Sequence, residues 1–354
     1  MFRKIPFSER ELIPVRIDPA RFHMPEMPVF DTPVTPRENY SCLYSEKKPF
    51  WMPIYGESRM FNSKLYSERL GRGWQKQDGH DVFGLHWVFV PSAGGAIVHP
   101  GNPLLDDVNN WRSVIKLPDV TEWDWAAEAE TTPKIDPNFS AEMSFVNGFW
   151  FERLISFMDF MPAALALIDE DQTDAIKDLF QQTTDMACKL VDIFCEYWPA
   201  MDMINIHDDW GAQKAPFFSE QVAYELFVPY MKQLTDHIHS KGRIATLHSC
   251  GHNEDRVQCY IDGGFDHWAP QTMNDIHKLY AEYGDKIVFA VWPDEFDFEH
   301  TTEAEQRAFA RKFVEEYTQP GKPVTLSVDG IRKTNRVFVE EVYAHSRKIY
   351  AERG

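Results

Sequence analysis

The sequence predicts an α/β fold of the TIM (β/α)8 barrel type with an irregular N-terminal extension. From about residue 48 onward, short apolar segments alternate with amphipathic helical segments, a pattern typical of a parallel sheet. The apolar segments number eight, which is the strand count of a TIM barrel. No G-x-G-x-x-G or G-x-x-x-x-G-K-[ST] motif follows any of them, so a doubly wound nucleotide-binding sheet is only the second choice.

The predicted strands are short runs rich in apolar and β-branched residues. They lie near residue 50 (F-W-M-P-I), at 82–90, near 143 (M-S-F-V), and at 202–207, 243–248, 265–268, 286–291 and 323–328. Helical periodicity predicts helices at about 173–198, 219–241, 274–283 and 302–318. Ser219 is a suitable N-cap for the second of these helices, and Thr301 or Thr302 for the fourth.

Two regions show weaker patterns than the predicted barrel. Residues 1–47 are proline-rich and weakly periodic, and we interpret them as an N-terminal extension to a barrel at 48–354. Residues 91–140 contain G-G, P-G and N-P pairs, which favour turns, so this stretch is expected to be an irregular addition.

Charge and cysteine content limit the functional classes. Lys and Arg total 36 against 55 Asp and Glu, a net charge of −19 that disfavours binding to nucleic acid or to anionic membranes. The five cysteines are irregularly spaced, which argues against a disulfide framework. The N-terminal residues M-F-R-K-I-P-F-S-E-R lack an apolar signal region, so we expect a cytoplasmic protein.

Polar side chains follow several predicted strands, at the carboxyl ends where TIM barrels place their active sites. These are His207, Asp208, Asp209, His248, Cys250, His267, Glu295 and Asp329. We predict catalytic roles for Asp208, Asp209 and Glu295, although a pair of aspartates after a strand is also typical of a helix cap and a solvated turn. His207 and His267 are expected to be hydrogen-bonded partners rather than ligands.

His248 and Cys250 are the predicted metal ligands. Side chains alternate along a strand, so residues two apart point the same way, and imidazole and thiolate are both good zinc donors. The alternative is a merely polar strand end.

Aromatic content favours a flat, apolar substrate. The chain has 11 tryptophans, 26 phenylalanines and 13 methionines. Several lie near the predicted strand ends, and we expect about half of these to pack in the core. The residues predicted to contact substrate are Trp51, Tyr55, Phe83, Phe149, Trp210, Trp268 and Trp292.

Three segments carry a family resemblance: H-D-D-W-G-A-Q-K-A-P-F-F-S, K-G-R-I-A-T-L-H-S-C-G-H and G-G-F-D-H-W-A-P-Q. They resemble the uroporphyrinogen decarboxylase superfamily, and most closely its corrinoid-dependent methyltransferase branch, the methyltransferase component of O-demethylase systems. The resemblance runs from about residue 48 to the C-terminus and implies a TIM barrel. The decarboxylases carry R-x-x-R-Q-A-G-R after the first strand, where this chain has W-M-P-I-Y-G-E-S-R-M with Arg59 as the only nearby base.

The resemblance implies a zinc-dependent methyltransferase. His248 and Cys250 match the H-x-C zinc ligands of the branch, and Asp329 stands where the pattern places a further cysteine; Glu295 is a suggested fourth ligand. Zinc would activate a methoxylated aromatic, and the methyl group would pass to the Co(I) corrinoid (cobalamin) of a partner protein, because the chain lacks a D-x-H-x-x-G motif. The alternatives are a decarboxylase and a non-catalytic binding barrel. The sequence predicts no particular oligomeric state.

Overall fold

The structure is a computed structural model that describes residues 4–20, 24–71, 78–91, 95–327 and 333–353, without the side chain of Tyr55. The chain divides into two compact units. Unit 1 comprises Met1–Arg59, Asp136–Ala141 and Asp266–Gly354, and unit 2 comprises Met60–Ile135 and Glu142–Phe265.

Seven strands belong to one sheet in the order β12-β11-β10-β9-β8-β7-β3. Their bounds are β3 Ser58–Phe61, β7 Ser140–Phe145, β8 Met203–His207, β9 Ile244–His248, β10 His267–Ala269, β11 Val288–Val291 and β12 Val324–Leu326. Each strand neighbours the next one along the chain, and the pairs β7–β8, β8–β9, β10–β11 and β11–β12 are parallel. A doubly wound sheet would reverse its order at a switch point, whereas a TIM barrel keeps this sequential order. The predicted fold class is therefore confirmed.

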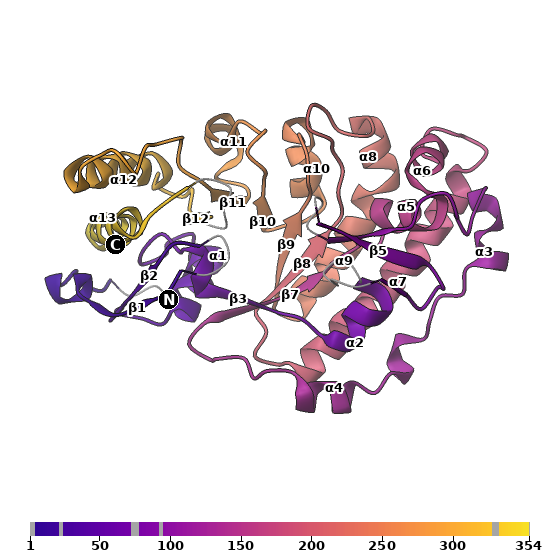
Figure 1. Ribbon diagram of the computed structural model, residues 1–354, viewed down its shortest axis with the longest axis horizontal. Helices are drawn as coiled ribbons and strands as arrows, with labels where there is room; N and C mark the ends of the chain where they lie inside the picture. Colours follow the sequence, from indigo (N-terminus) through magenta and orange to yellow (C-terminus); the bar gives the residue numbers. More distant parts are fainter. Residues whose placement is uncertain (1–3, 21–23, 72–77, 92–94, 328–332, 354) are drawn as a thin grey trace. The chain divides into compact units, whose positions relative to one another are not determined.

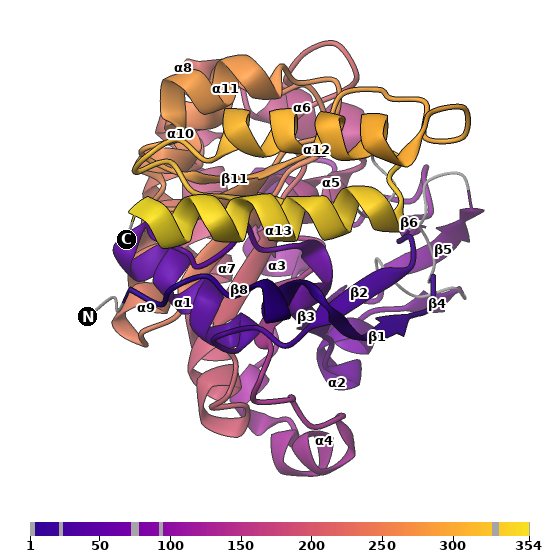
Figure 2. The same cartoon turned by 90° about the vertical axis from the view of Figure 1, so that its left-hand side faces the viewer.

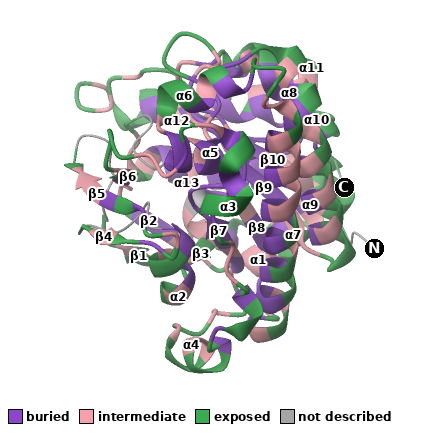
Figure 3. Ribbon diagram, turned by 90° about the vertical axis from the view of Figure 1, so that its right-hand side faces the viewer, coloured by how far each residue is buried: buried purple, intermediate pink, exposed green. Residues whose placement is uncertain are grey.

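The helices of unit 2 follow its strands. They are α2 Lys64–Tyr66, α3 Trp111–Val114, α4 Trp125–Thr131, α5 Phe151–Met158, α6 Phe160–Ala166, α7 Thr173–Tyr197, α8 Glu220–Leu226, α9 Val228–Ser240 and α10 Val257–Asp262. The helices α7 and α9 pack against each other beside β8 and β9 (Figure 1). Their outward positions are exposed or half-buried (Figure 3), as expected for helices that cover a sheet on one side only.

The predicted helix at 219–241 is two helices, α8 and α9. Ser219 caps α8 as predicted, with its hydroxyl accepting the N–H of Val222. The break falls at Phe227, two residues before Pro229. Proline lacks the N–H that a continuing helix needs but fits the first turn of a new one, so the chain restarts as α9.

The predicted barrel strand at 82–90 is wrong. The strand β5 (His86–Val90) instead pairs antiparallel with β4 (Gly79–His80) and β6 (Gly95–Val98) in a separate sheet. The turn between β4 and β5 is built locally, because the Asp81 carboxylate accepts the N–H groups of Phe83 and Leu85 and Gly84 has a φ of 81°. An apolar run cannot by itself distinguish this hairpin from a barrel strand.

Unit 1 contains the antiparallel strands β1 (Pro14–Asp18) and β2 (Met27–Phe30) and the helix α1 (Pro36–Glu46). Its other helices are α11 (Ile276–Tyr283), α12 (Glu303–Tyr317) and α13 (Arg336–Arg353), of which α12 and α13 lie side by side (Figure 2). Residues 1–47 thus hold more regular structure than the weak periodicity predicts.

The predicted strand near residue 50 is reduced to a single parallel bridge between Ile54 and Leu326. Pro53 accepts the N–H of Leu326 but has no N–H of its own to continue the ladder.

Among the helices of the described residues, none is long and apolar enough to cross a bilayer.

Candidate metal centre

The carboxyl ends of β8 and β9 place two histidines opposite each other in unit 2. The parallel register pairs His207 with His248, and their rings are stacked with centroids 4.6 Å apart at an interplanar angle of 27°. Asp209 and Cys250 lie two residues beyond these strand ends. Asp209 Oδ1 lies 3.9 Å from His207 Nδ1, and Cys250 Sγ lies 3.2 Å from His248 Nε2.

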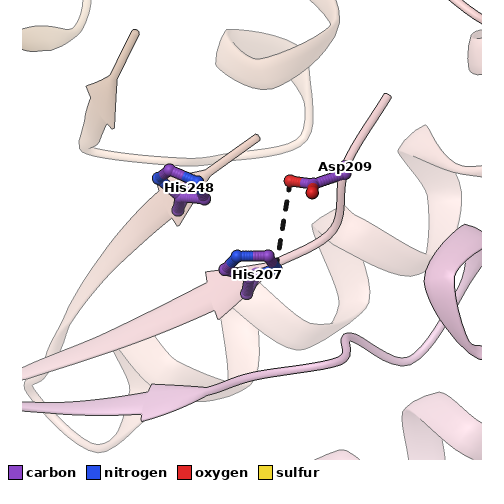
Figure 4. A group of neighbouring side chains, drawn as sticks. All are labelled: His207, Asp209 and His248. Atoms are coloured by element: carbon purple, nitrogen blue, oxygen red, sulfur yellow. Dashed lines mark ion pairs between the residues drawn. The ribbon is translucent and has the colours of Figure 1, made fainter. Parts of the chain in front are cut away.

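These residues form a cluster with the composition of a metal site (Figure 4). His207, Asp209 and His248 each offer a ligand atom, and these atoms lie within 4.8 Å of one another. Cys250 adjoins the cluster, with its Sγ 3.2 Å from His248 Nε2. Imidazole, carboxylate and thiolate are all zinc donors, so this donor set fits the zinc ion that the family resemblance implies.

Two glycines allow the loops that carry these ligands to touch. Gly251 has a φ of 96°, and a Cβ there would lie 2.2 Å from the carbonyl carbon and oxygen of Gly211. The N–H of Gly211 donates to the carbonyl of Cys250, and the Asp209 carboxylate accepts the N–H of Cys250 at 2.7 Å. The glycines of H-S-C-G and D-D-W-G therefore bring Asp209 and Cys250 together.

Glu152, in the first turn of α5, completes the cluster from a third element. Its Oε2 lies 2.7 Å from Nδ1 of His207. Carboxylates in this position orient a metal-binding imidazole and increase its basicity. The sequence predicted His207 as a hydrogen-bonded partner, in agreement with this contact, but not as a member of the cluster of possible ligands, and it did not point to Glu152 at all. Period two and the strand register would have revealed His207, but no local pattern links Glu152 to a strand 55 residues away.

Asp208 points to the opposite face from Asp209 and is fully buried. Its carboxylate accepts the backbone N–H groups of Phe151 and Glu152 at the start of α5 and the indole N–H of Trp210. Burial raises the pKa of Asp208 to about 7. This placement makes Asp208 a cap of α5 that positions Glu152, and the catalytic role expected for Asp208 stays a prediction.

The two histidines have opposite proton affinities. Burial and the proximity of His207 lower the pKa of His248 to about 4, so it stays neutral and can act as a metal ligand. Burial also opposes charge on His207, but attraction to Glu152 and Asp209 outweighs it and raises the pKa of His207 to about 9. Metal binding through His207 would therefore release a proton.

Of the predicted aromatic residues of unit 2, Trp210 and Phe149 lie in the core, whereas Phe83 is half-buried. Trp210 is fully buried and packs against Phe218, with its indole N–H bound to Asp208. Phe149 is buried against Phe145. Phe83 is half-buried in the turn after β4, where Arg153 lies over its ring.

The remaining predicted residues belong to unit 1. Trp51, Trp268 and Trp292 are buried, whereas Glu295 is exposed in the loop after β11. Asp329 and the side chain of Tyr55 lie outside the described residues.

Trp51 leads to a prediction about pH dependence. Its indole N–H donates to both oxygens of Glu57 at 3.0 Å, and burial raises the pKa of Glu57 to about 7. Because the pKa is raised in the folded state, the protonated Glu57 makes its full contribution to the free energy of unfolding below its unfolded-state pKa. This contribution is lost as the pH rises through about 7. Glu57→Gln cannot ionise, so as the pH rises from below the unfolded-state pKa to above 7 its free energy of unfolding should rise relative to the wild type, by on the order of 3 kcal/mol.

Urea unfolding at both ends of this pH window measures that difference. The exposed Glu299, also in unit 1, provides the control Glu299→Gln, for which we expect no such trend. A Glu57→Gln curve parallel to that of the wild type would contradict the prediction.

Comparisons with known proteins bear on the fold. The chain matches no protein-family model and no curated protein. It is similar in structure to a methyltransferase from Methanosarcina mazei, with a TM-score of 0.55 and 12% identity over 90% of this chain and 99% of that chain. A xylanase from Thermoanaerobacterium saccharolyticum gives a TM-score of only 0.30 at 11% identity, over 55% of this chain and 67% of that chain, too low to carry an argument. At such identity the first similarity shows the fold alone.

Proposed function

We propose that this protein is a zinc-dependent methyltransferase that moves a methyl group from an aryl methyl ether to the corrinoid of a partner protein. The observation that carries the proposal is the convergence of His207, Asp209 and His248, with Cys250 beside them, at the carboxyl ends of two parallel strands. This edge is where TIM barrels conduct chemistry. The structural similarity to a solved methyltransferase supports the proposal at the level of the fold.

The four donors have separable roles. His207, Asp209 and His248 would hold the zinc ion, with Cys250 beside them as an alternative donor, so that one position stays open. Bound zinc would act there as a Lewis acid on the ether oxygen. Glu152 keeps the His207 ring in place by accepting from its Nδ1. The Asp209 carboxylate also accepts the backbone N–H of Cys250, and this hydrogen bond keeps the Cys250 thiol beside His248.

The reaction balances without a redox partner. The methyl group leaves the ether as a cation equivalent, the bonding pair stays on the phenolate oxygen, and Co(I) supplies the pair for the new cobalt–carbon bond. Charge develops on the phenolate oxygen as the bond breaks, and electrostatic stabilisation contributes most there. The corrinoid is the methyl acceptor and comes from a partner, because the chain lacks a corrinoid-binding motif.

A direct assay tests the proposal. The purified protein is mixed with a reduced corrinoid protein, and conversion of Co(I) to methyl-Co(III) is followed by absorbance while the methyl donor is varied. We expect turnover with a guaiacol-type ether and release of the phenol. Turnover only with thiols or methylamines would reject the ether as substrate, and release of carbon dioxide from uroporphyrinogen would reject methyl transfer altogether.

A further inference from the structure

Three exposed histidines form a row on the small antiparallel sheet of unit 2. His80 in β4 pairs in register with His86 in β5, and their rings are stacked with centroids 4.9 Å apart at 17°. His99 follows β6, and its backbone N–H donates to the backbone carbonyl of His86. The rings of His99 and His86 are also stacked, with centroids 5.4 Å apart at an interplanar angle of 10°. We call these residues the histidine row.

The histidine row presents three imidazoles on three adjacent strands. The stacked rings do not share the close ligand spacing of the candidate metal centre, so their nitrogens would meet at one ion only after the side chains change rotamer. Exposed side chains make such changes at little cost. Nδ1 of His99 lies 3.1 Å from the carbonyl of Pro100, and this contact directs the hydrogen to Nδ1 and leaves Nε2 bare as a donor. Other planar side chains could stack equally well at these positions. All three positions carry imidazole, which is also a metal ligand.

We propose that His80, His86 and His99 bind a divalent transition-metal ion, with zinc as the physiological candidate, at a second site separate from the candidate metal centre. Imidazole is a preferred ligand for zinc, copper and nickel. Three imidazoles from three strands leave one position for water, and such an ion would cross-link β4, β5 and β6.

The contacts of this sheet indicate what the ion would stabilise. The turn between β4 and β5 is joined to α5 by Arg153, whose guanidinium lies 5.3 Å from the Phe83 ring and 3.9 Å from the Asp81 carboxylate. Arg153 follows Glu152 in α5, and Glu152 binds His207 of the candidate metal centre. An ion on the histidine row would therefore hold the hairpin that packs against α5.

Zinc titration of chelator-stripped protein by calorimetry tests the proposal. The variant His248→Ala, which disrupts the candidate metal centre, should still bind one equivalent of zinc and show a higher melting temperature with zinc than without. His248→Ala combined with His86→Gln should bind at least about 100-fold more weakly, because loss of a direct ligand should exceed the usual effect of losing an outer hydrogen-bond partner. His86 is the informative position because it contacts both other rings.

Two further variants complete the experiment. His99→Gln in the same background keeps the His80–His86 pair and should weaken zinc binding, so it serves if the His86 variant fails to fold. His300→Gln removes an exposed histidine of unit 1 and should change nothing. The proposal is overturned if folded His248→Ala binds no zinc, or if neither His86→Gln nor His99→Gln lowers its affinity.

Discussion

His248→Ala should lose the metal ion of the candidate metal centre together with its methyl transfer activity. His248 is central to the candidate metal centre because it faces His207 across β8 and β9 and lies 3.2 Å from the thiol of Cys250. Burial lowers the pKa of His248 to about 4, so its imidazole is already neutral and can bind a metal ion without first losing a proton. We expect the rate of methyl transfer to fall by more than about 100-fold. In the His86→Gln background, which disrupts the histidine row, the metal content after dialysis should also fall to background.

Atomic spectroscopy of the purified variant and the corrinoid absorbance assay measure the two losses. His237→Ala removes a half-exposed histidine of α9 that pairs with Asp192 of α7, and this control should retain metal and activity. Near-stoichiometric metal in folded His248→Ala combined with His86→Gln, which also disrupts the histidine row, would disprove the assignment. Cys250→Ala then decides whether the thiol is a ligand, because metal should be lost only if Cys250 binds it directly.

Gly251→Ala should be the most destabilising small substitution near the centre. A Cβ at Gly251 would lie 2.2 Å from the Gly211 backbone, and the φ of 96° is unfavourable for any residue with a side chain. Both contacting groups are backbone atoms, at Gly251 and Gly211, and they cannot move aside as the end of a flexible side chain could. We expect the free energy of unfolding to fall by about 2–4 kcal/mol, from backbone strain together with overpacking, and metal affinity to fall because Cys250 is displaced.

The other end of the same strand offers the matched control. Gly242, in the turn between α9 and β9, also has a positive φ of 67°, but a Cβ there would meet no atom within 4 Å. Gly242→Ala should therefore cost only the conformational part, about 1 kcal/mol, and leave metal binding unchanged. Chemical denaturation followed by circular dichroism compares the two variants, and equal losses of stability would show that the contact with Gly211 is unimportant.

Much of the fold could be predicted because its signals are local. The apolar runs that became β7 to β12 and the cap at Ser219 depend on residues within a few positions of one another. The same is true of His248 and Cys250, since alternation along a strand places residues two apart on one face whatever the surroundings. The run at 82–90 shows the limit, because β5 has the composition of a barrel strand but pairs with β4 and β6.

The identity of the whole cluster depended on the tertiary structure. His207 becomes a candidate ligand only because the register of β8 against β9 places it opposite His248, and Glu152 reaches it only because α5 begins beside the end of β8. Adjacent aspartates with the same sequence context take different roles, Asp209 in the cluster and Asp208 in the cap of α5. The sequence by itself determined which residue types stand at the strand ends and which of them share a face. The tertiary structure decided which of those side chains meet, because strand register and helix placement arise from packing between segments far apart in the chain.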